Sequence, residues 1–131
     1  MEIEVELTRI IINEASDQQV IVLKDRGGPR SFPIVIGMPE ILAIDRRLKG
    51  FELPRPMTHD LLGSVIKSMG GELERVVIND LNNHTFYAKL YIKSADGEVV
   101  IDSRPSDALA LSAGLGVPVF VDEQVFEKMQ Q

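Results

Sequence analysis

The chain of 131 residues contains no cysteine and no tryptophan, and only 5% of its residues are aromatic. The absence of cysteine excludes disulfides and thiolate metal sites, so any metal ion would need carboxylate or imidazole ligands. Acidic residues outnumber basic ones, which gives a formal net charge of −6. This charge disfavours non-specific electrostatic binding to nucleic acid. It does not exclude an enzyme that binds a single phosphodiester locally.

Long apolar stretches are also missing, so no segment predicts a membrane span. Residues 1–6 alternate between apolar and acidic side chains, unlike a signal peptide. We therefore expect a cytoplasmic protein with no membrane partner. The length and the ordinary proportions of hydrophobic (44%) and charged (26%) residues indicate one globular domain over residues 1–131.

An internal repeat is the strongest organisational signal. Residues 6–13 match residues 72–79 at five of eight positions, an offset of 66 residues. The same offset relates Pro39 to Pro105 and Gly50 to Gly116. Runs of β-branched residues separated by polar turns predict strands, and apolar residues at helical spacing follow them in each half. The sequence thus predicts an α+β fold with mainly antiparallel sheets, built from a duplicated β-β-β-α unit (about 1–50 and 72–116).

Residues 58–69 are expected to form an extra helix inserted between the copies. Thr58 is the expected N-cap, and Gly70 with Gly71 is the expected stop. The apolar residues share one helical stripe, which predicts a face packed on the core; they are Leu61, Leu62, Val65, Ile66 and Met69.

Two similar clusters begin helices, at residues 55–60 (Arg-Pro-Met-Thr-His-Asp) and 104–107 (Arg-Pro-Ser-Asp). Helix N-termini favour anions because their N–H groups are unpaired and lie at the positive end of the dipole. A cation, hydroxyls and an acid at such a place suit a phosphate-handling site. They suit an ordinary capped helix equally well, and the sequence leaves both interpretations open.

Residues 53–61, 85–88 and 102–110, in this order and spacing, resemble the signature of the bifunctional nuclease domain, as do residues 33–37 with Glu40 and Ala43. The resemblance covers about residues 4–126. It implies a bacterial-type domain associated with both RNase and DNase activity. One departure from the pattern is Pro39 beside Glu40, which shifts the start of that helix.

Phosphodiester hydrolysis needs an activated water, neutralisation of the phosphoryl oxygens and a proton for the leaving oxygen. Asp60 and Asp107 are candidate bases or metal ligands, and Glu40 is a further candidate ligand; alternatively, both aspartates only favour the helix dipole. His59 is a candidate for proton transfer. Asp102, near the end of an apolar strand, is a fourth candidate, although a buried ion pair with a neighbouring arginine explains it equally well.

Candidate substrate-binding residues complete the set. Arg55 and Arg104 are expected to clamp phosphate, with hydroxyls from Thr58 and Ser106 beside them. Tyr87 is expected either to stack on a base or to pack in the core or a dimer interface. His84, in a predicted hairpin turn, is expected to be solvated.

Three functions therefore remain open: a nuclease acting on RNA and DNA, a regulatory module that binds an anion without chemistry, and an oligomerisation domain. For the nuclease, hard carboxylate ligands favour Mg²⁺ or Mn²⁺. The sequence contains no P-loop and no dinucleotide-binding fingerprint, so we expect no organic cofactor. Short strands with exposed edges predict a homodimer or higher homo-oligomer.

Overall fold

The computed structural model describes residues 1–129. Its strands are β1 (Glu2–Ile11), β2 (Gln18–Asp25), β3 (Ser31–Gly37), β4 (Glu72–Asn82), β5 (Thr85–Ser94), β6 (Gly97–Ser103) and β7 (Val119–Asp122). Its helices are α1 (Met38–Leu48), α2 (Thr58–Ser68), α3 (Pro105–Leu115) and α4 (Glu123–Met129). None of these helices is long and apolar enough to cross a bilayer.

The strands form one sheet in the order β3-β2-β1-β7-β4-β5-β6. Each half contributes an antiparallel meander, and β7 joins the two by pairing antiparallel with β1 and parallel with β4. The α+β class with mainly antiparallel pairing is therefore confirmed.

The order β-β-β-α occurs twice, and α2 lies between the two occurrences. The 66-residue offset places β3 on β6 along their whole lengths. It also relates Gly50 (φ 75°) to Gly116 (φ 69°), which both follow the helix of their half in the left-handed region that glycine tolerates best. Superposition of the two halves in space stays a prediction.

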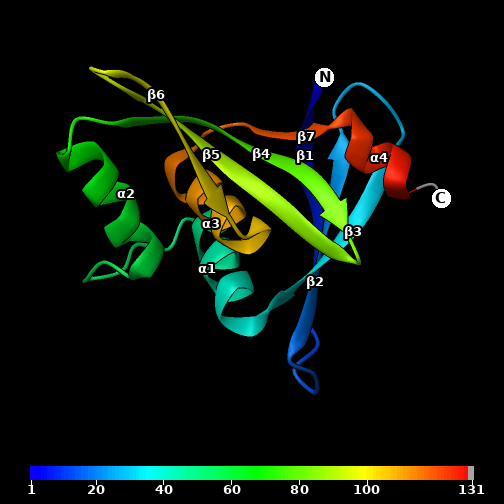
Figure 1. The fold of residues 1–131 in the computed structure, drawn as a ribbon. Coiled ribbons are helices and arrows are strands. Elements are labelled where there is room, and N and C mark those ends of the chain that lie inside the picture. Colours follow the sequence, from blue (N-terminus) through cyan, green and yellow to red (C-terminus); the bar gives the residue numbers. More distant parts are fainter. Residues whose placement is uncertain (130–131) are drawn as a thin grey trace.

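The core lies between the curled sheet and the pair of helices α1 and α3, which pack against each other on one face (Figure 1). Alternate residues of β2 and β3 are buried, as expected for strands with one face toward the core. Helix α3 is buried at five consecutive positions, Ala108 to Ser112. A helix surrounded in this way is held on several sides, so its first turn is a rigid platform for functional groups.

Helix α4 is tied to the sheet by ion pairs. Arg30 donates to Glu123 at 2.6 Å and Lys128 donates to Asp80 at 2.6 Å. These hydrogen bonds hold the pKa values of the Glu123 and Asp80 carboxyl groups below their ordinary range. Because the folded pKa is depressed, the stability they contribute is present above the ordinary carboxyl pKa and is lost as the pH falls.

Helix α2 differs from the prediction on two points. Met57, and not Thr58, is its N-cap, because Thr58 already has helical geometry. The apolar stripe is not buried as a whole: Ile66 is half-buried, whereas Leu61, Val65 and Met69 are exposed. The reason is that α2 contacts mainly α3 and only slightly β4, so only the side that carries Gly63 and Ile66 is covered.

Candidate active site

The two clusters noted in the sequence meet through one hydrogen bond. Nε2 of His59, in the first turn of α2, lies 2.9 Å from Oδ1 of Asp107, in the first turn of α3. The side chains are 21% and 41% exposed, so the pair is partly shielded and still reachable from solvent. Residues 48 positions apart are therefore joined at one place, as a site assembled from both motifs requires.

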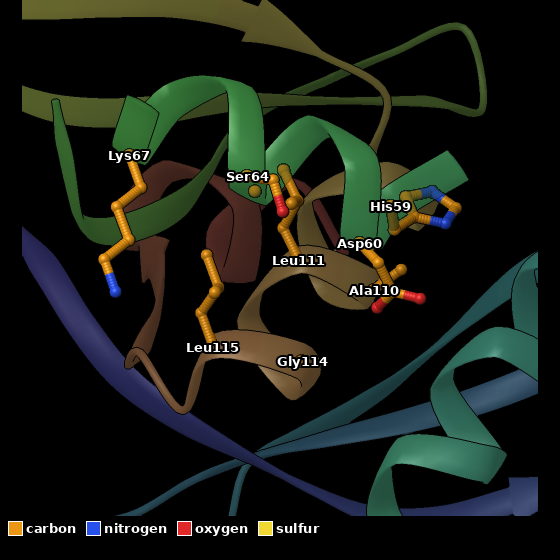
Figure 2. Close-up of a pocket in the computed structure, with 9 residues that line it drawn as sticks. His59, Asp60, Ser64, Lys67, Ala110, Leu111, Gly114 and Leu115 are labelled. Carbon is orange, nitrogen blue, oxygen red and sulfur yellow. The ribbon is translucent and has the colours of Figure 1, made fainter. Parts of the chain in front are cut away.

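A cavity of about 250 Å³ runs between α2 and α3 beside this pair. Figure 2 shows His59 and Asp60 at one end of it and Lys67 at the other, with Ser64 between them on α2. The α3 side is apolar and consists of Ala110, Leu111, Gly114 and Leu115. The cavity thus offers an imidazole, a hydroxyl and an ammonium group along one helix, opposite an apolar wall.

Asp60 has structural partners. Its carboxylate forms an ion pair with Arg47 of α1 and accepts a hydrogen bond from the Met57 backbone N–H at 2.9 Å. The second contact caps α2 from its third residue, whereas the sequence analysis expected the cap to come from Thr58. Because Arg47 and the helix end both engage Asp60, this carboxylate joins α1 to α2 and is less suited to act as a base.

The prediction of a buried ion pair between Asp102 and Arg104 is wrong. Asp102 is exposed on β6, because this strand forms an edge of the sheet and its side chains face solvent. Arg104 is 71% exposed, and the acid nearest to it is Glu40 of α1, at 3.9 Å. Asp102 therefore lies outside the core and forms no hydrogen bond with the His59–Asp107 pair.

The remaining predicted residues differ in their exposure. Arg55 is exposed in the connection before α2 and forms no ion pair among residues 1–129. Tyr87 is exposed on β5, so core packing is wrong, whereas stacking on a base and packing in a dimer interface stay predictions. Ser106 is buried, and its hydroxyl has no hydrogen-bond partner within the described part of the chain.

The metal candidates Asp60, Asp107 and Glu40 do not form one cluster. Among residues 1–129, no group of three or more histidine or acidic side chains is placed to hold a metal ion. A cage of protein ligands alone therefore does not fit. Asp107 uses Oδ1 toward His59 and accepts no other side-chain hydrogen bond from the described residues. One such carboxylate does fit a hydrated Mg²⁺ or Mn²⁺ shared with a substrate phosphate.

Three residues near the pair were not predicted as site residues from the sequence: Arg47, Ser64 and Lys67. For Lys67 a signal existed, because positions 59, 63 and 67 follow one another at four-residue spacing and therefore share a helix face. For Arg47 there was none, since its partner Asp60 belongs to a different helix and the contact is set by tertiary packing.

A carboxylate bound to one ring nitrogen of histidine fixes the orientation and tautomer of the ring. With Nε2 donating to Asp107, the other nitrogen, Nδ1, carries the lone pair and is able to accept a proton. The geometry thus supports general base chemistry by His59, with Asp107 as the positioning residue.

Comparison with known proteins agrees with the sequence motifs. The sequence profile described as "Bifunctional nuclease domain" matches residues 21–131. An uncharacterized protein from Mycobacterium tuberculosis is 39% identical over 122 residues, which covers 93% of this chain and 73% of the relative.

Plant proteins are more distant relatives. Bifunctional nuclease 2 from Oryza sativa subsp. japonica is 28% identical over 84% of this chain and 35% of its own length. Bifunctional nuclease 1 from the same plant is 23% identical over 87% of this chain and 36% of its own length. This chain spans about a third of each of these plant proteins. Because the profile covers most of its length, the chain belongs to the bifunctional nuclease domain family.

Proposed function

We propose that the protein is a nuclease that hydrolyses phosphodiester bonds of RNA and DNA at the His59–Asp107 pair. The observation that carries this proposal is the 2.9 Å contact between these two side chains, which joins the two motifs in a solvent-accessible place. Membership of the bifunctional nuclease domain family and the names of the plant relatives support the same activity.

In this proposal His59 Nδ1 takes a proton from a water molecule while the water oxygen attacks phosphorus. The P–O bond to the leaving sugar breaks, and the departing oxygen takes a proton from solvent. Attack by water, and not by a ribose 2′-hydroxyl, explains how one site serves both RNA and DNA. Lys67, at the far end of the cavity, is placed to attract the strand.

We propose that a divalent cation, Mg²⁺ or Mn²⁺, assists this reaction. Asp107 would hold it together with the substrate phosphate, and it would supply charge neutralisation at the phosphoryl oxygens. Because one carboxylate alone binds such an ion weakly, we expect EDTA to abolish hydrolysis of single-stranded RNA and DNA. Added Mg²⁺ or Mn²⁺ should restore it, with no change in the melting temperature. Full activity in excess chelator would reject this role of a metal.

A second candidate function is a module that binds anions without chemistry. The observation in its favour is the exposed Arg104 at the start of α3, away from the lining of the cavity beside His59. The two candidates differ in one measurement, because a binding module releases no cleaved product from a labelled strand at any concentration of divalent metal.

We further propose that the protein forms a homodimer through β6. This edge strand exposes the β-branched residues Val99, Val100 and Ile101, whereas the opposite edge, β3, contains Pro33, which blocks pairing. Light scattering should give the mass of a dimer at micromolar concentration. Val100→Lys should give a monomer, while Val35→Lys on the β3 edge should remain dimeric. A monomeric wild-type protein would refute the proposal.

A further inference from the structure

A second groove lies at the start of α3, and no residue that lines it also lines the cavity beside His59. Its volume is about 320 Å³, and it is bounded by β3, by the turn between β4 and β5, and by the first residues of α3. The sheet curls so that β3 approaches β5 without pairing with it (Figure 1). Phe32 of β3 stacks on Phe86 of β5, with the ring centroids 5.6 Å apart. Three elements distant in sequence thus build one concave surface.

The α3 end of this groove is suited to an anion. The side chain of Arg104 is largely exposed and contributes to the lining. Helix α3 is 11 residues long, and no side chain caps its N-terminus. The first N–H groups of such a helix have no partner within the helix and carry the positive end of its dipole. Arg104 and the first residues of α3 thus line the same end of the groove.

Ser106 gives an independent indication of a ligand. The residue is 3% exposed and belongs to the groove lining. Its Oγ is one of two buried side-chain atoms, with Asn79 Oδ1, that lack a hydrogen-bond partner among residues 1–129. A buried hydroxyl without a partner costs free energy, and native proteins seldom leave one unsatisfied. An acceptor bound in the groove would supply the missing partner.

His84 contributes an imidazole to the lining of the groove. Asn83 and His84 are the two residues of the β4–β5 turn, and both have positive φ, 51° and 64°. Such turns strongly favour glycine at the second position, because a side chain there is strained. The turn therefore carries a histidine at a cost to stability, and that histidine lines the groove. Even the neutral ring offers one N–H donor.

The β3 side of the groove is apolar, with Pro33 and the exposed Val35 beside Phe86 of β5. We propose that this groove binds one nucleotide unit, with its phosphate at Arg104, Ser106 and the α3 N-terminus and its base against the β3 wall. The choice of a nucleotide as the ligand rests on the proposed function. The phosphate site itself rests only on the residues that line the groove.

Glu40 competes for the same arginine. Its Oε1 lies 3.9 Å from an Nη of Arg104, too far for a hydrogen bond and close enough for attraction. A phosphate that binds Arg104 must overcome this attraction. Glu40→Gln should therefore tighten binding of the nucleotide, which is an effect that a purely structural role of Glu40 would not produce.

Titration calorimetry of the full chain with 5′-AMP, adenosine and inorganic phosphate tests the proposal. We expect 5′-AMP to bind at least about tenfold more tightly than either fragment, because only the nucleotide engages both walls. Arg104→Ala should weaken 5′-AMP binding by about 10- to 100-fold. Arg9→Ala, which removes an exposed arginine elsewhere on the sheet, should bind 5′-AMP like wild type.

His84→Gly separates binding from folding. Glycine suits the left-handed turn, so the melting temperature should stay the same or rise, while affinity for 5′-AMP should fall by about threefold or more. The proposal that this groove binds a nucleotide would be overturned by undetectable binding of 5′-AMP at millimolar concentration. Wild-type affinity in both Arg104→Ala and His84→Gly would overturn it as well. Equal affinity for 5′-AMP and phosphate would overturn the base contact. Hydrolysis is measured separately, so a protein that binds 5′-AMP and cleaves nothing refutes the nuclease and not the groove.

Discussion

Replacement of Asp107 by asparagine should lower kcat for hydrolysis of single-stranded RNA and DNA by about 10²- to 10⁴-fold. The asparagine amide no longer holds the His59 ring in the tautomer that leaves Nδ1 free, and it does not stabilise the ring once it has taken a proton. The side chain is partly exposed, so the lost pair should change the melting temperature by about 3 °C or less. Steady-state kinetics and thermal unfolding measure the two effects.

Asp102→Asn is the matched control for this variant. Asp102 belongs to the same motif and loses the same charge, but it is exposed on β6, and the hydrogen bond to His59 comes from Asp107. We expect it to retain wild-type kcat and KM. Full activity in Asp107→Asn, or an equal loss in both variants, would contradict the assignment of Asp107.

Replacement of Leu111 by alanine should lower the free energy of unfolding by about 2–5 kcal/mol. Leu111 is 1% exposed in the middle of α3, so its removal leaves a cavity that the packed core cannot fill by small shifts. Because α3 positions both Asp107 and the groove at Arg104, the account requires this helix to be a well-packed element. Denaturant unfolding followed by circular dichroism measures the change.

Leu115→Ala provides the comparison on the same helix. Leu115 is 48% exposed near the end of α3, so its truncation should cost about 1 kcal/mol or less. If the two variants were equally stable, α3 would not be packed as described, and the positions of the groups on its first turn would lose their support.

The sequence predicted most of the fold because the relevant signals are local. Alternating apolar residues mark strands such as β2 and β3, and Gly50 and Gly116 mark the ends of α1 and α3. The repeat added long-range information, since it required each half to have the same order of elements. The exposure of α2 was not predictable in this way, because helical periodicity shows an apolar face without showing whether anything covers it.

The candidate site was predictable in its residue types and only partly in its contacts. His59 and Asp107 were both selected from the motifs, and the structure joins them. The pairing of Asp60 with Arg47, and of Arg104 with Glu40 instead of Asp102, depends on how α1 packs against α2 and α3. His84 is exposed in its turn, as the sequence predicted. Its place in the lining of the second groove was not predictable, since nothing local shows that the curled sheet brings β3 beside that turn.

The central claim is that His59 and Asp107 act as one unit in hydrolysis, and a double-mutant cycle tests it most directly. The rate constant for cleavage of a labelled single strand is measured for wild type, His59→Gln, Asp107→Asn and the double variant, each with its melting temperature. Because Asp107 acts partly through His59 and would also hold the metal, the account predicts that the loss in the double variant is smaller than the product of the two single losses. Losses that multiply, as for two independent groups, would contradict it.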